Sequence, residues 1–127
     1  MKRNWPEYAR YFVMAWFLIG GLGHFVATDF FVRITPAWVP YPREVVWLSG
    51  VFELAGVLGL ALPKLRQLAA WCLFLLTLAV TPANIGMALN PQEFPEFPAV
   101  LLYLRLLLQV FLLACILVTA GVVKPAK

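Results

Sequence analysis

Residues 99–123 read AVLLYLRLLLQVFLLACILVTAGVV, an apolar run in which Arg105 is the only charged residue. A helix needs about 20 mostly apolar residues to cross the hydrocarbon core of a bilayer. The run does not alternate with polar residues as a membrane-barrel strand does, and inside lipid the backbone must satisfy its own hydrogen bonds. The run therefore predicts a transmembrane helix.

Three further segments of suitable length and composition precede this run, at residues 8–27, 45–62 and 67–89. Glu53 is the only charge in the second of them, and the third carries none. Prolines fill the connections, where they interrupt helices. We therefore expect an all-α fold, a four-helix transmembrane bundle in a single domain covering residues 1–127. The last two connections are short, so we expect an up-down-up-down order.

The composition of the whole chain agrees with a membrane protein. Of its 127 residues 63% are hydrophobic and 13% are charged, whereas a soluble domain is typically about 45–50% apolar and roughly 25% charged. This excludes a soluble enzyme, a disordered chain and a nucleic-acid binder as first interpretations. The net charge of +4 is typical of basic residues kept on the cytoplasmic side of a membrane.

The basic residues also predict an orientation. One side of the bundle would carry Lys2, Arg3, Arg10, Lys64, Arg66, Lys124 and Lys127. The other side would carry only Arg33 and Arg43. The positive-inside rule then places both termini in the cytoplasm, and we expect the bacterial inner membrane. We expect the first span to be retained, because residues 25–28 form a weak signal-peptide cleavage site.

Polar residues fall at helical spacing on each span, which places each set on one helix face. With both termini in the cytoplasm, the polar residues of the four spans also lie at a similar depth, near the outer leaflet. We expect these stripes to meet in one polar cluster that forms the candidate ligand-binding site. Its members are His24, Ser49, Glu53, Thr81, Asn84, Arg105 and Gln109.

Glu53 and Arg105 carry the only charges deep in the spans, and we expect them to pair. Three interpretations stay open. The pair and its polar neighbours fix helix register, or the cluster lines a small outward-facing cavity in which Arg105 binds an acidic or carbonyl oxygen, or the cluster relays protons. Pro82, beside Asn84, is expected to kink its helix, with Thr81 or water bonding the freed carbonyl of residue 78.

The connection at residues 28–44 is too long for a simple turn and is rich in aromatic and proline residues. We expect a short interfacial helix and a proline-ordered segment over the bundle mouth, either as an anchor or as a lid. We expect no metal site, because His24 is the only histidine and both cysteines, Cys72 and Cys115, lie at the opposite depth. The cysteines form no redox motif.

Four short motifs follow one another in the chain. They are Gly23-His24-Phe25, Pro36-Ala37-Trp38-Val39-Pro40, Ser49-Gly50-Val51-Phe52-Glu53 and Pro82-Ala83-Asn84-Ile85-Gly86-Met87-Ala88. This ordered series resembles the DoxX-like family of small four-helix membrane proteins, from about residue 17 to residue 89. The resemblance implies a bundle with the motif residues at one end. Members of that family are associated with quinone-linked sulfur oxidation, redox-stress complexes and the assembly of other membrane proteins.

Two functions follow as hypotheses. The first is a non-catalytic subunit or assembly partner of a membrane complex, with the lipid bilayer and a protein partner or second copy as its contacts. The second is a quinone-linked oxidoreductase component that holds a lipid-soluble redox molecule in the polar cluster. A quinone is the one cofactor suggested. A solute carrier is a third idea, and it would need oligomers to enclose a pore.

Overall fold

The computed structural model describes residues 4–122, and within that range the chain forms only helices and the loops that join them. Four of the helices are long and apolar enough to cross a membrane, which supports an integral membrane location. These long helices are α1 (Trp5–Val26), α3 (Pro42–Ala61), α4 (Arg66–Leu89) and α5 (Ala99–Thr119). A short helix, α2 (Thr28–Ile34), follows α1, and a 3₁₀ turn, η1 (Pro91–Glu93), follows α4.

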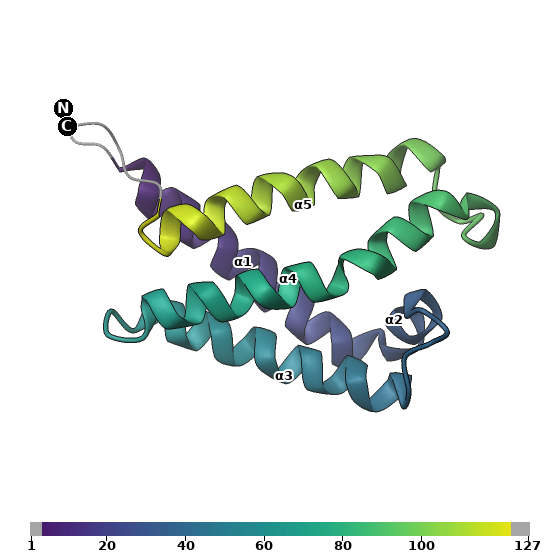
Figure 1. Ribbon diagram of the computed structural model, residues 1–127, viewed down its shortest axis with the longest axis horizontal. Helices are drawn as coiled ribbons and strands as arrows, with labels where there is room; N and C mark the ends of the chain where they lie inside the picture. Colours follow the sequence, from purple (N-terminus) through teal and green to yellow (C-terminus); the bar gives the residue numbers. More distant parts are fainter. Residues whose placement is uncertain (1–3, 123–127) are drawn as a thin grey trace.

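The long helices pack as a bundle in which α1 and α4 each contact both α3 and α5. The loop between α3 and α4 lies at the same end as the start of α1 and the end of α5 (Figure 1). At the other end lie α2 and the connection that carries η1 (Figure 1).

The helix ends depart from the expected spans for local reasons. α1 and α3 begin three residues early, because Pro6 and Pro42 occupy first-turn positions where proline needs no N–H partner. α3 ends at Ala61, ahead of Leu62, because a residue that precedes a proline is driven out of the helical region. α5 ends at Thr119 and Gly121 adopts a positive φ of 86°, as glycines after helices often do. Position 123, the last of the expected span, lies outside the described residues.

The apolar core fills the half of the bundle where α1 begins and α5 ends. Val13, Leu60, Ala70 and Ile116 are fully buried there, one from each long helix. A smaller apolar cluster around Met87 closes the other end between α4 and α5. The outer faces of the long helices expose many large apolar side chains, as surfaces in contact with lipid do.

Candidate functional site

A cavity of about 430 Å³ lies between the four long helices, at the end of the bundle that α2 covers. Most of its wall is apolar, with Phe17, Leu76, Val80 and Leu112 among the lining residues. The polar side chains along its wall are His24, Thr35, Ser49, Glu53, Thr77, Asn84, Arg105 and Gln109. A largely apolar cavity with a few convergent polar groups is the usual form of a small-molecule site.

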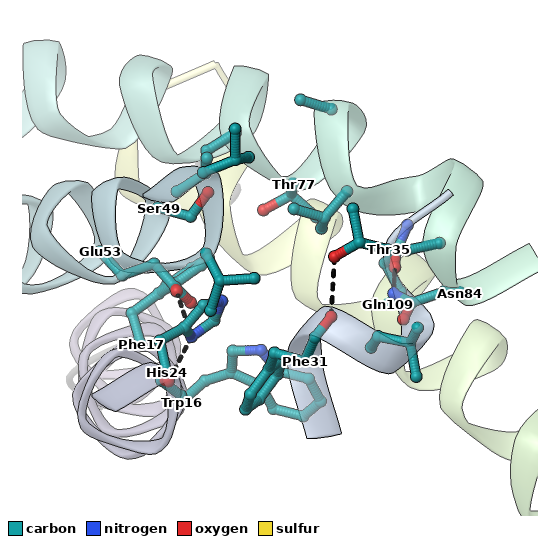
Figure 2. Close-up of a pocket in the computed structure, with 18 of the residues that line it drawn as sticks. Trp16, Phe17, His24, Phe31, Thr35, Ser49, Glu53, Thr77, Asn84 and Gln109 are labelled. Atoms are coloured by element: carbon teal, nitrogen blue, oxygen red, sulfur yellow. Dashed lines mark hydrogen bonds and ion pairs between the residues drawn. The ribbon is translucent and has the colours of Figure 1, made fainter. Parts of the chain in front are cut away.

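The expected polar cluster is therefore gathered around one cavity. All its members except Thr81 line the wall, and Thr81 lies directly behind it, bonded to Gln109. Figure 2 shows His24 and Glu53 on one side of the cavity and Asn84 with Gln109 on the other. Phe31 and Thr35 lie between these two groups in the same view (Figure 2).

His24 and Glu53 form the first polar group. Nδ1 of His24 lies 2.7 Å from the carbonyl oxygen of Gly20 and 3.0 Å from Oε2 of Glu53. A carbonyl only accepts, so Nδ1 carries a hydrogen and donates it to Gly20. Oε2 of Glu53 is buried and has no hydrogen-bond partner between residues 4 and 122, despite its short distance from Nδ1.

The ring of His24 is held from the other side by α2. It stacks on Phe31 with the ring centroids 4.1 Å apart and the planes 15° from parallel. Both His24 and Glu53 have side chains that are about nine-tenths buried, with 11% and 10% exposed. Nε2 of His24 makes no hydrogen bond within the part of the chain described here. It is therefore free to meet a molecule in the cavity.

Arg105 heads the second polar group. Its guanidinium donates to Oδ1 of Asn84 at 3.2 Å and contacts Sδ of Met87 at 3.0 Å. Both of these partners are neutral. No nitrogen of Arg105 lies within 4.0 Å of a carboxylate of any residue from 4 to 122. The arginine thus lines the cavity as a cation without a protein counterion in this range.

A hydrogen-bond chain runs from Arg105 between α4 and α5. Asn84 accepts from Arg105 and donates its amide to Oε1 of Gln109. The amide of Gln109 donates to Oγ1 of Thr81, whose hydroxyl donates to the carbonyl of Thr77 at 2.9 Å. Each group donates in one direction and accepts in the other, so the amide orientations are determined by the chain. The chain holds Asn84, and through it Arg105, in a defined position.

The expected pairing of Glu53 with Arg105 is wrong. Glu53 lies against His24 because α3 packs against α1, and Arg105 turns to Asn84 because α5 packs against α4. Helices α3 and α5 are not among the pairs in extensive contact. The spacing of the polar residues predicts the helix face and the membrane depth on which each one lies, but it does not predict which helices are adjacent. The two charges nevertheless face the same cavity.

Helix α2 and residues 35–39, here called the cover segment, close this end of the cavity. Phe31, Ile34, Thr35, Pro36 and Val39 of the segment line the wall. The sequence predicted a short helix and a proline-ordered segment at this place, and the helix is confirmed.

Polar contacts at both ends of α2 hold the cover segment. Arg33 donates to both carboxylate oxygens of Glu96 at 2.7 and 2.8 Å, and Arg43 donates to Asp29 at 2.6 Å. The hydrogen bonds from Arg33 lower the pKa of the Glu96 carboxyl. Both ion pairs are solvent-exposed, so each contributes little to stability on its own.

Comparison with known proteins identifies the family. Residues 13–120 match the family described as a domain of unknown function, DUF8561. The chain belongs to the DUF8561 family. No curated protein and no solved structure matches the chain. The matched range includes every residue that lines the cavity of this DUF8561 chain.

Some wall residues of the DUF8561 cavity are not among the predicted site residues. Thr77 shares the helix face of Thr81 and Asn84 that the spacing predicts, and it lines the wall although the predicted site leaves it out. Thr35 and Phe31 of the cover segment carried no such signal, because a short connection has no helical stripe to continue. Trp16 lies on an apolar stretch of α1, where nothing distinguishes a wall residue from a lipid-facing one.

Pro82 lies inside α4, which continues as a helix on both sides of it. The hydroxyl of Thr81 donates to the carbonyl of Thr77 and not to that of Leu78, the carbonyl that Pro82 leaves without its usual donor. Thr81 is thus committed to the hydrogen-bond chain. Of the two partners expected for the carbonyl of Leu78, Thr81 is wrong and water stays a prediction. The kink itself stays a prediction.

Both cysteines of the DUF8561 chain are free, Cys72 exposed and Cys115 buried. Between residues 4 and 122 no group of three or more His, Cys, Asp or Glu side chains is arranged to hold a metal ion.

Proposed function

We propose that this DUF8561 protein is a small integral membrane protein that binds a small, largely apolar molecule in the cavity. The bound molecule presents an acceptor oxygen, carbonyl or anionic, to Arg105. One observation carries the proposal: Arg105 faces an apolar cavity while bonded only to neutral groups.

The energetic argument is that a charge inside a membrane span is expensive. An arginine at the centre of a spanning helix costs about 2.5–3.5 kcal/mol on insertion scales, and such residues usually face partners or pathways. In this chain the hydrogen-bond chain positions Arg105 without neutralising it. A role in fixing helix register does not need a charge, since Asn84 and Gln109 already link α4 to α5. Binding an external acceptor does need one.

We further propose the membrane arrangement expected from the sequence. The spans run up-down-up-down in the bacterial inner membrane, with both termini in the cytoplasm. The cavity then lies towards the outer leaflet, and the cover segment faces the outside. A lipid-soluble molecule would reach the cavity from the outer half of the bilayer or beneath the cover segment.

Two related ideas remain proposals. The resemblance to DoxX-like proteins rests on the motif series alone. It suggests that the ligand is a quinone and that the protein is a component of a redox complex. The carbonyl oxygens of a quinone would suit Arg105. A role as subunit or assembly partner rests on the exposed apolar helix faces, which lipid would cover equally well. The cavity favours ligand binding over a purely structural role.

The test is to extract the protein with its own lipid and identify what it carries. Full-length protein purified in native lipid, or in a mild detergent, would be extracted with organic solvent and the extract analysed by mass spectrometry. We expect a small molecule in stoichiometric amount that is lost from Arg105→Gln. Arg10→Gln is the matched control, because Arg10 lies near the start of α1, at the end of the bundle opposite the cavity. Equal content in both variants would remove Arg105 from the site, and absence of any enriched molecule would count against the function.

A further inference from the structure

We infer that the molecule bound in the cavity is an amphiphilic carboxylate, with its head on Arg105 and its apolar body along the wall. This rests on the proposed function and narrows its ligand class from any acceptor oxygen to a monoanion.

The balance of charge inside the cavity is the first step. Three ionisable side chains line the wall: His24, Glu53 and Arg105. His24 and Glu53 lie 3.0 Å apart, and the pair is neutral when it holds one ionisable proton, either on the Glu53 carboxyl or as the second proton of the His24 ring. Arg105 has no acidic neighbour within 4.0 Å in the range 4–122. With the first pair neutral, the cavity holds one uncompensated positive charge, which a monoanion cancels.

The donors of Arg105 are the second step. A guanidinium has five N–H donors. One goes to Asn84 and one faces the thioether of Met87, which leaves three. A carboxylate takes two parallel N–H donors from arginine, and such charge-assisted bonds are about twice as strong as neutral ones. The thioether is a weak acceptor that a carboxylate would displace readily.

The position of Arg105 is the third step. Asn84 is oriented by Gln109, and Gln109 by Thr81, before any ligand arrives. The guanidinium is thereby held against the wall, and less conformational entropy is lost when a ligand binds.

The rest of the wall sets the class of anion. A single arginine matches a carboxylate, whereas a phosphate monoester carries nearly two negative charges at neutral pH. The wall beyond Arg105 is mainly apolar, which suits an acyl or aromatic body, and about 430 Å³ is within the range of small-molecule cavities. His24 Nε2, which has no partner in the described range, offers a second polar contact across the cavity.

The experiment compares two probes that share one acyl chain and differ in the charge of the head group. Decanoate and methyl decanoate would be titrated separately into full-length protein in a non-ionic detergent, with bound probe counted by native mass spectrometry. We expect decanoate to bind about tenfold more tightly than its ester, or better, which is what one charge-assisted contact contributes. Arg105→Gln should lose this preference, Arg105→Lys should keep part of it, and the control Arg10→Gln, near the start of α1, should bind as the wild type does.

A second variant makes the test independent of removing the arginine. Asn84→Asp places a carboxylate where Arg105 already donates at 3.2 Å, so the protein would supply its own counterion. We expect this variant to remain folded and to lose the preference for decanoate.

The outcomes separate the inference from the proposed function. Equal binding of acid and ester would overturn the carboxylate inference and leave the binding cavity standing. Undiminished decanoate preference in Arg105→Gln or in Asn84→Asp would also overturn it. If neither probe binds and the purified protein carries no extractable molecule, both the inference and the proposed function fall.

Discussion

Arg105 is a partly buried cation whose neighbours are neutral, and this makes its contribution to stability unusual. Removing one member of a buried ion pair destabilises strongly, because the other charge is left without a partner. No carboxylate depends on Arg105 in the described range, so its removal leaves no acid unpaired. A side chain kept for binding rather than for stability should behave in this way.

We therefore predict that Arg105→Met does not destabilise the ligand-free protein. Its free energy of unfolding should stay within about 1 kcal/mol of wild type or rise, because an unpaired charge is replaced by an apolar side chain of similar length. Unfolding by denaturant in mixed micelles measures this. A loss above about 3 kcal/mol would show that an acidic group depends on Arg105.

Glu53→Gln tests the other polar group. Nδ1 of His24 already donates to Gly20, so the amide should change the free energy of unfolding by only about 1 kcal/mol. The same unfolding titration applies, with Glu44→Gln as a control outside the cavity. A loss of roughly 3–5 kcal/mol would instead mean that His24 is charged and that Glu53 is its counterion.

Sequence spacing was enough to place these residues around one cavity and not enough to pair them. His24, Glu53 and Arg105 were identified because polar groups in an apolar helix are few and their periodicity is visible. Pairing depends on which helices are adjacent. The spacing of residues within one helix carries no information about its neighbours. The charge rule that joined Glu53 to Arg105 also overlooked a closer polar neighbour for each of them, His24 for Glu53 and Asn84 for Arg105.

The contact between α1 and α3 depends on glycine at one crossing point. A Cβ on Gly50 would lie 2.8 Å from a ring carbon of Phe25, 2.9 Å from Cβ of His24 and 3.2 Å from the carbonyl oxygen of Gly21. The last of these is backbone and cannot rotate away. Close approach of two backbones at small residues is a common way for membrane helices to pack.

Gly50→Ala should therefore push α1 and α3 apart and destabilise the protein by about 1–3 kcal/mol. Gly86→Ala is the matched control, since a Cβ there meets nothing within 4 Å and alanine is the better helix former. The difference in thermal unfolding midpoint between the two variants reports the effect. Equal midpoints would mean that the two helices are not in close contact at Gly50.

The helices themselves were largely predictable, because the length of an apolar run and the positions of prolines can be read from the local sequence. The four spans were placed to within a few residues, and the short helix after the first span was expected. The early starts at Trp5 and Pro42 depend on proline in a first turn, which hydropathy does not register. The stacking of Phe31 on His24 depends on how α2 folds back, and no local signal encodes that.

The cover segment joins parts of the chain that are far apart in sequence. Arg33 of α2 reaches Glu96 in the connection before α5, and it also lies 4.8 Å from the ring centroid of Phe94. Because the hydrogen bonds from Arg33 lower the pKa of Glu96, the pair stabilises the folded chain above the ordinary pKa of that carboxyl. The stabilisation is lost as the pH falls through the lowered value.

We expect α2 to open more readily at acidic pH. Amide hydrogen exchange in α2, corrected for the intrinsic rate at each pH, should increase as Glu96 becomes protonated. Glu96→Gln should show faster exchange at every pH and a weaker dependence on pH, since only the Arg43–Asp29 pair then remains at α2. The effect is small, since the pair is exposed. A wild type and a Glu96→Gln variant with identical pH profiles would show that the pair does not hold the cover segment.

The orientation of the bundle decides from which side a ligand enters. Gln92, in η1, and Lys64, between α3 and α4, are exposed loop residues at opposite ends of the bundle. In a background with Cys72→Ala and Cys115→Ala, a single Gln92→Cys should react with a membrane-impermeant maleimide in intact cells. A single Lys64→Cys should react only after the cells are permeabilised, because the positive-inside rule places Lys64 in the cytoplasm. The opposite labelling pattern would turn the cover segment towards the cytoplasm, and the ligand would then have to come from the inner leaflet or the cytosol.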